Sequence, residues 1–149
     1  MADPTTRSSR TPWHLWVIAV VSLLWNAVGA FDFLMTQTRN AAYLKNITPA
    51  QLDYFFSFPS WVVIAWGVAT WGSFFASLFL LLRKPLAVSL FVVSLVGMAI
   101  TFGHNYVLTD GLRISGDRSG TLIFTAVIVV IGVPLLLYAR AMRKRGVLG

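Results

Sequence analysis

The chain contains no cysteine and little charge. Without cysteine it can form no disulfide, thiolate metal site or iron–sulfur cluster, and it has no cysteine nucleophile. Only 11% of its 149 residues are charged and 57% are hydrophobic, whereas an ordinary soluble domain carries about 25% charged residues. Too few polar side chains are present to cover a globular surface. The composition therefore predicts a small integral membrane protein.

Sequence signatures of catalysis and ligand binding are also missing. The chain has neither the phosphate loop G-x-x-x-x-G-K-[ST] nor the zinc sequence H-E-x-x-H. Its two histidines, His14 and His104, are expected at opposite faces of the membrane, so one monomer cannot use both for a single metal. Asp32 with His104 would supply two ligands, fewer than the usual four of a structural zinc site. We expect no enzymatic activity, no metal and no other cofactor.

Several apolar segments are long enough to cross a membrane as helices, which takes about 20 residues. They cover residues 13–35, 61–82, 86–107 and 121–141. The backbone hydrogen bonds of a spanning segment must be satisfied within the membrane, either by a helix or by a closed barrel. Four segments are too few to close a barrel, so each must be a helix. The sequence predicts an all-α membrane protein. It would be a single antiparallel four-helix transmembrane bundle between an N-terminal tail (1–12) and a basic tail (142–149).

Lysine and arginine are distributed unevenly between the two sides of this bundle. Eight lie on the side that holds both termini: Arg7, Arg10, Arg83, Lys84, Arg140, Arg143, Lys144 and Arg145. Four lie on the other side: Arg39, Lys45, Arg113 and Arg118. Because short loops rich in these residues stay in the cytoplasm, both termini are expected there. Basic residues beside a span contact anionic lipid, so we expect membrane lipids and not nucleic acid as partners.

The first apolar segment has a second interpretation as a cleaved secretory signal peptide. Arg7 and Arg10 precede an apolar stretch, and the small pair Val28 and Ala30 would place a cleavage point after Ala30. Signal peptides have an apolar region of only about 7 to 15 residues. Here the apolar run continues to Met35 and three more spans follow, which favours a retained first helix.

The connection between the first two spans carries a helix start. Thr48 suits an N-cap, Pro49 suits the first helical position, and Gln51 suits the capping box. Mostly apolar residues follow as far as Pro59, so we predict a short interfacial helix over 49–57 on the outer membrane surface. A loop pressed on lipid by its apolar side chains is the alternative.

Small residues predict how the helices pack. The second and third spans are joined only by residues 83–85 and must form an antiparallel hairpin. Ala65, Ala69, Gly72 and Ala76 form one ridge on the second span, where they permit close approach of another helix. The same ridge offers a surface for a homo-oligomer or a larger membrane complex.

Polar residues form a stripe on each of two spans, and both stripes are expected to face the bundle interior because a polar group facing lipid is costly. The stripe on the first span contains Ser22, Trp25, Gly29, Asp32 and Thr36, with Asn26 at its margin. The stripe on the third span contains Ser94, Gly97, Thr101, His104 and Asn105.

Asp32 and His104 are the main candidates for a binding site, since each lies three residues before the predicted outer end of its span. If the two helices are adjacent, a carboxylate and an imidazole meet in the outer leaflet, as in proton relays and ligand sites, and Arg39 can join them. The alternative is that Asp32 and His104 hold helices together in the hydrated interface region of the membrane. Asn26 is a further binding candidate, although an interhelical hydrogen bond is the preferred interpretation for it.

Beyond its N-terminal tail, nearly the whole chain resembles a known family. The relevant residues are Trp25, Asn26, Gly29 and Asp32, then Thr36, Gln37, Thr38 and Arg39, then Phe58, Pro59 and Trp61, and the leucines before Arg83 and Lys84. This pattern is similar to that of a mostly uncharacterised family of small four-span proteobacterial inner-membrane proteins, often labelled sugar transporters. The resemblance implies an inner-membrane location and brings no catalytic or binding residues with it.

Two functions are compatible with these residues. The first is a non-enzymatic accessory or interaction protein of the inner membrane. The alternative is a small oligomeric transporter or permease component for a sugar or another small solute, with proton coupling as one option. A single bundle of this size is small for alternating access, which commonly uses two repeats around a central site.

Overall fold

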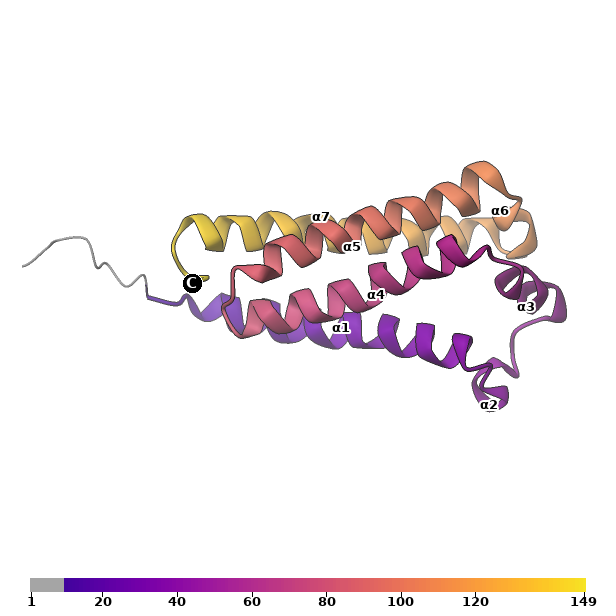
Figure 1. Cartoon of the computed structure of the whole chain (residues 1–149), viewed down its shortest axis with the longest axis horizontal. Helices are drawn as coiled ribbons and strands as arrows, with labels where there is room; N and C mark the ends of the chain where they lie inside the picture. The colour runs from indigo at the N-terminus through magenta and orange to yellow at the C-terminus, as the bar shows by residue number, and fades with distance from the viewer. Residues whose placement is uncertain (1–9) are drawn as a thin grey trace, which may run out of the picture.

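The computed structural model describes residues 10–149, and all regular secondary structure in this part of the chain is helical, without strands (Figure 1). Its elements are α1 (Trp13–Gln37), α2 (Ala41–Leu44), α3 (Pro49–Phe56), α4 (Ser60–Leu81), α5 (Leu86–Gly103), the π-helix η1 (His104–Leu108), α6 (Gly111–Ile114) and α7 (Arg118–Lys144). Four helices are long and apolar enough to span a membrane: α1, α4, α5 with η1, and α7. The predicted all-α four-helix architecture is confirmed.

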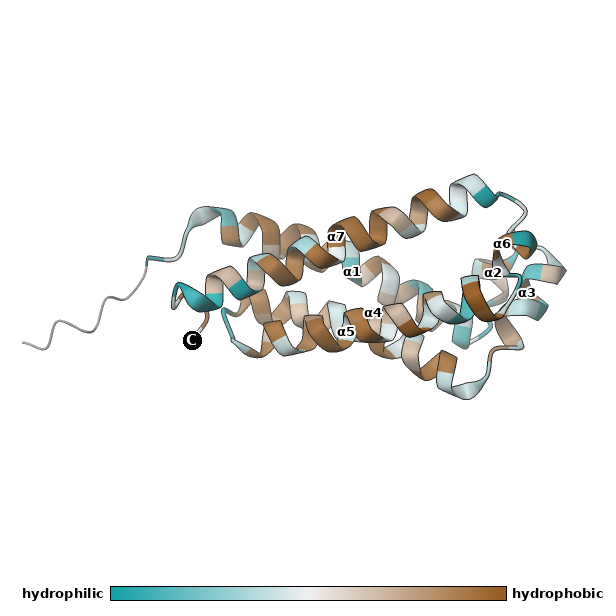
Figure 2. Ribbon diagram, turned by 90° about the horizontal axis from the view of Figure 1, so that it is seen from above, coloured by the Kyte–Doolittle hydropathy of each residue, from teal (hydrophilic) through white to brown (hydrophobic). Residues whose placement is uncertain are grey.

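The long helices follow a fixed order of neighbours. α4 packs along α5, α1 packs against α4, and α7 packs against α5. α1 and α5 are not a closely packed pair. Figure 2 shows hydrophobic residues along all the long helices and hydrophilic residues gathered at the two ends of the bundle. We call these the termini end, which holds the start of α1 and the end of α7, and the loop end, which holds α2, α3, α6 and η1.

The small residues of α4 form its contact with α5. A Cβ atom on Gly72 would lie 3.3 Å from the Cβ atom of Ser94. The hydroxyl of Ser94 donates a hydrogen bond of 2.6 Å to the carbonyl of Ala69. Such approach is possible only between helices with small side chains, as the ridge on the second span predicts. Because α5 covers this face within the chain, an oligomer would have to use another surface.

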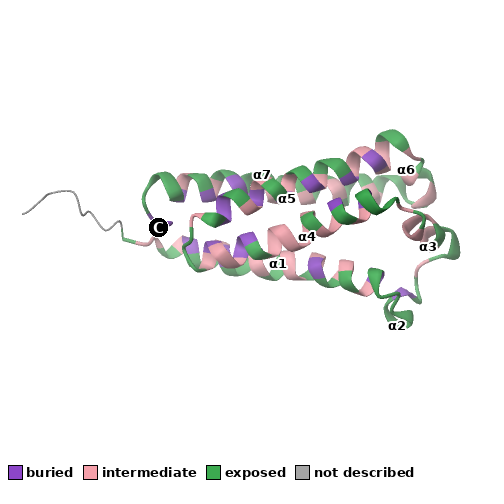
Figure 3. Cartoon of the chain, viewed as in Figure 1, coloured by how far each residue is buried: buried purple, intermediate pink, exposed green. Residues whose placement is uncertain are grey.

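The best-packed part of the bundle lies toward the termini end, where buried residues gather (Figure 3). The core there contains Leu15, Ala19, Ala76, Leu80, Ala87, Val88, Phe91, Leu135, Leu136, Ala139, Met142, Val147 and Leu148. The outward faces of the helices expose apolar side chains along the length of the bundle; Val21 of α1, for example, is 61% exposed and Ile123 of α7 is 65% exposed. A membrane would cover this surface with lipid.

The C-terminal residues differ from the predicted basic tail. α7 continues through Pro134 as far as Lys144, and Gly146 then adopts a left-handed conformation with φ of 70°. This residue reverses the chain, so that Val147 and Leu148 are buried in the core and the amide of Gly149 donates to the carbonyl of Arg83 at 3.0 Å. Residues 147–149 therefore pack back on the bundle, and only the cations before them are exposed.

The short helix of the first connection is confirmed. The Thr48 hydroxyl accepts from the Gln51 amide, and the Gln51 side chain accepts from the Thr48 amide. These bonds make the predicted capping box at the start of α3. The sequence did not predict α2, α6 or η1. Two of them are single turns, and nothing in local propensity distinguishes a π turn from the end of an α-helix.

Candidate functional site

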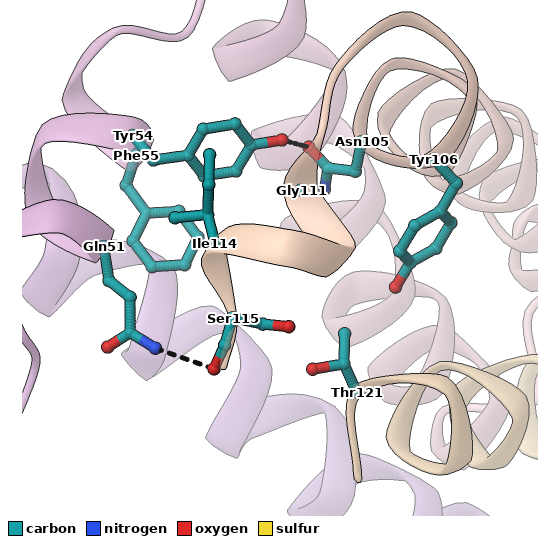
Figure 4. Close-up of a pocket in the computed structure, with 9 residues that line it drawn as sticks. All are labelled: Gln51, Tyr54, Phe55, Asn105, Tyr106, Gly111, Ile114, Ser115 and Thr121. Atoms are coloured by element: carbon teal, nitrogen blue, oxygen red, sulfur yellow. Dashed lines mark hydrogen bonds between the residues drawn. The ribbon is translucent and has the colours of Figure 1, made fainter. Parts of the chain in front are cut away.

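A small cavity lies at the loop end, between α3, α6, η1 and the start of α7 (Figure 4). Its volume is about 110 Å³, well below the roughly 300 Å³ at which pockets for small molecules usually begin. The lining residues are Gln51, Tyr54, Phe55, Asn105, Tyr106, Gly111, Ile114, Ser115 and Thr121. Several of them carry hydroxyl or amide groups, so the cavity suits water or one small polar group.

Tyr54 fastens α3 to the π turn. Its hydroxyl donates to the Asn105 side-chain oxygen at 3.0 Å and lies 2.7 Å from the Thr109 hydroxyl oxygen. The Thr109 hydroxyl donates to the His104 carbonyl at 3.0 Å. Turns of π-helix are rare and often occur at functional sites, where they redirect side chains. Here the turn presents the amide of Asn105 to the cavity and to Tyr54 (Figure 4).

Gln51 and Tyr106 add two further ties around the cavity. The Gln51 side-chain amide donates to the Ser115 carbonyl at 3.1 Å, which joins α3 to the end of α6. The Tyr106 hydroxyl is hydrogen-bonded to the Thr125 hydroxyl, which joins η1 to α7. The loop end is therefore held by side-chain hydrogen bonds between segments that are far apart in the sequence.

His104 is buried beside the cavity in aromatic surroundings. Its ring centroid lies 5.3 Å from that of Phe58 and 5.5 Å from that of Trp61, and both rings are nearly perpendicular to the imidazole. Its Nδ1 atom lies 3.4 Å from the Asn105 side-chain oxygen, a long contact for a hydrogen bond. Asn105 therefore lies between the imidazole and the cavity.

Asp32 and Arg39 lie at the same end but contact other elements. The Asp32 carboxylate accepts a hydrogen bond of 2.7 Å from the Tyr43 hydroxyl of α2. This bond to a carboxylate raises the pKa of Tyr43 from 10.0 to about 12. The Arg39 guanidinium carbon lies 4.2 Å from the centre of the Phe56 ring of α3. Both residues thus connect the end of α1 to the short loop helices.

The structure does not bring Asp32 and His104 together. The reason is the order of the helices: α4 packs between α1 and α5, so the two polar stripes do not face each other directly. Within residues 10–149 the side-chain partners of Asp32 and His104 are different, and the one ion pair joins Arg113 to Asp110 at 4.0 Å on the surface. No group of three metal-ligating side chains occurs in this range either.

Asn26 makes the predicted interhelical hydrogen bond. Its side-chain amide donates to the Ser77 hydroxyl of α4 at 2.9 Å, and Ser77 in turn donates to the Ser73 carbonyl. The stripe on α5 faces the interior as expected, with Ser94, Thr101 and His104 buried. The stripe on α1 does so only in part, since Ser22 and Thr36 are buried while Trp25 is 39% exposed.

Sequence reasoning missed Tyr54, Gln51 as a bridging residue, and Thr109. One signal for the first two was present. Gln51 and Tyr54 are three residues apart on a helix with a clear start, so they share one face. Thr109 had no such signal, because its role depends on the π turn. Comparisons with family models, with curated proteins and with solved structures found no match to this chain.

Proposed function

We propose that the chain is a non-enzymatic protein of the bacterial inner membrane that acts by associating with another membrane component, with both termini in the cytoplasm. The charge distribution supports the orientation. The termini end carries seven cations and no acidic side chain among the described residues, whereas the loop end carries four cations and four aspartates. The positive-inside rule assigns the more basic end to the cytoplasm.

The observation that carries this function is the use of polar side chains inside the bundle. Asn26 bonds to Ser77, Ser94 to the Ala69 carbonyl, and Thr101 to the Gly97 carbonyl. These groups tie helices to one another or to their own backbone. A transporter needs polar groups near the bilayer midplane that exchange hydrogen bonds with a solute. An interaction protein needs only a stable bundle and an accessible face.

The first half of α7 offers such a face. This half of α7 packs against α5 and, near its start, against α6 and η1. Its side chains Ile123 and Phe124 are more than half exposed. In lipid, close packing contact and not the hydrophobic effect drives the association of such a helix with a partner. A helix face that no other part of the chain covers can therefore bind a partner helix with little loss of free energy.

Site-specific photo-crosslinking in cells tests the association. A photoreactive residue at Ile123 of α7 is compared with one at Val96 of α5, which is 55% exposed and serves as a matched control. We expect a discrete protein adduct from position 123 and none from position 96. Lipid adducts alone from both positions would overturn the proposal.

A flux measurement separates this function from transport. Purified protein is reconstituted in proteoliposomes, and sugar uptake is followed with and without a proton gradient. The proposed function predicts no uptake above that of empty vesicles. Uptake that is lost in the Asp32→Asn variant, with the fold retained, would establish the transporter alternative instead. A reporter fused after Gly149 tests the orientation separately: green fluorescent protein should fluoresce, and alkaline phosphatase should be inactive.

A further inference from the structure

An apolar groove runs between α1 and α7 near the termini end. It is lined by Ile18, Val130, Ile131, Pro134, Leu135 and Tyr138, and its volume is about 320 Å³. Toward the termini end, Tyr138 of the lining makes a hydrogen bond of 2.6 Å between its hydroxyl and His14 Nδ1. Apart from that hydroxyl, its lining side chains are hydrocarbon.

A cation lies beyond the end of the groove that Tyr138 lines, toward the termini end. Ile131 and Tyr138 of α7 and its C-cap residue Arg145 are spaced seven residues apart. Each step of seven residues turns about 20° around the helix axis, so all three lie within about 40° of one another. Arg145 is exposed and lies about 10 Å along the helix axis from Tyr138, by the rise of 1.5 Å per residue. Arg143 belongs to the same basic cluster but points about 140° away from Tyr138 around the helix.

The lining and position of the groove suit an acyl chain. The side chains of α1 and α7 that line it are apolar, and an acyl chain is unbranched, flexible and narrower than a helix, whose diameter is about 10 Å. A phospholipid whose acyl chain fills the groove would carry its phosphate toward Arg145, beyond the His14–Tyr138 pair.

We infer that the α1–α7 groove is a binding site for one anionic phospholipid, whose acyl chain packs on Ile18, Ile131 and Pro134 and whose headgroup is bound by Arg145. The inference combines an apolar groove with a cation of complementary charge on the same helix face. It does not depend on the proposed association through the first half of α7. Failure of either leaves the other standing.

Native mass spectrometry of the protein in mild detergent tests the site. The probes are dioleoyl phosphatidylglycerol and dioleoyl phosphatidylcholine, which share acyl chains and differ in headgroup charge. We expect one retained phosphatidylglycerol per chain and little phosphatidylcholine. Arg145→Gln should weaken phosphatidylglycerol binding about fivefold, the loss expected for about one basic contact, while Arg143→Gln, its matched control, should leave it unchanged.

A second pair of variants tests the groove itself. Ile18→Trp fills the groove and should abolish retention of the lipid, whereas Val17→Trp on the exposed neighbouring position should not. Equal retention of both lipids, or equal effects of Arg145→Gln and Arg143→Gln, would show diffuse attraction and overturn the site. A dimer that is lost only in Ile18→Trp would show that a second copy occupies the groove and would also overturn it. Thermal unfolding of each variant confirms that the fold is intact.

Discussion

Gly97 of α5 lies directly against the backbone of Ala65 of α4: a Cβ atom on Gly97 would stand 2.6 Å from the Ala65 carbonyl oxygen. No side chain can be accommodated there without separating the two helices. This contact belongs to the most extensive helix–helix interface of the described chain.

We predict that Gly97→Ala destabilises the protein by about 1 to 3 kcal/mol, the usual cost of overpacking. Gly29→Ala on α1 is the matched control, since a Cβ atom there meets nothing within 4 Å. The control should be neutral or slightly stabilising because alanine favours helix over glycine. Thermal unfolding in a mild detergent measures both. If the two variants are equally stable, α4 and α5 can move apart at Gly97 without loss of free energy, which would contradict the prediction.

The hydrogen bond between Asn26 and Ser77 should couple α1 to α4. A double-mutant cycle with Asn26→Ala and Ser77→Ala should give a coupling energy of about 0.6 kcal/mol, the average for hydrogen bonds between membrane helices, and at most about 1.7 kcal/mol. Ser77→Ala alone also removes a bond to the Ser73 carbonyl, and the cycle subtracts that effect. If the effects of the two single variants on the free energy of unfolding simply add, the hydrogen bond contributes nothing to stability.

Tyr54 should control the order of the loop end. Tyr54→Phe keeps the ring but removes the hydroxyl that bonds to Asn105 and contacts Thr109. We expect faster hydrogen exchange in α3 and α6, and a loss of about 1 kcal/mol of stability. Ser57→Ala is the control, because the Ser57 hydroxyl bonds only to the Tyr54 carbonyl within the same segment. The exchange rate in α3 should stay unchanged in that variant.

Tyr43 makes stability depend on pH in the alkaline range. Its pKa rises from 10.0 to about 12 in the folded protein because its hydroxyl donates to Asp32. A raised folded-state pKa stabilises the protein fully below pH 10, and this stabilisation is lost as the pH rises from 10 through about 12. The wild type should therefore lose more stability over this interval than Tyr43→Phe. In Asp32→Asn, ultraviolet titration should show that the pKa of Tyr43 returns toward 10.

Much of the fold could be predicted from particular residues. The short connection at 83–85 makes α4 and α5 antiparallel neighbours, and Thr48, Pro49 and Gln51 start α3. The polar spacing of Ser94, Gly97 and Thr101 indicated the buried face of α5 correctly. These features are local, because periodicity, caps and short connections act within a few residues.

The candidate site was less accessible to this reasoning. Asp32 and His104 were expected to meet if their helices were adjacent. The depth of two residues in the membrane does not determine which helices are neighbours. α4 separates them because its small residues fit against α5 on one side while Asn26 and Phe33 of α1 pack on it from another. The π turn at His104–Leu108, which presents Asn105 to Tyr54, is stabilised by partners far away in the chain.

The sequence by itself determined that this chain is a set of apolar helices with one strongly basic end. Apart from a closed barrel, only a helix satisfies the backbone hydrogen bonds of a segment in lipid. Only the tertiary structure decided which helices are neighbours, that residues 147–149 pack back on the core, and where the cavity and the groove lie. Those features depend on close contacts between distant segments. Because lipid supplies no hydrophobic force between helices, these contacts are determined by the detailed fit of the side chains.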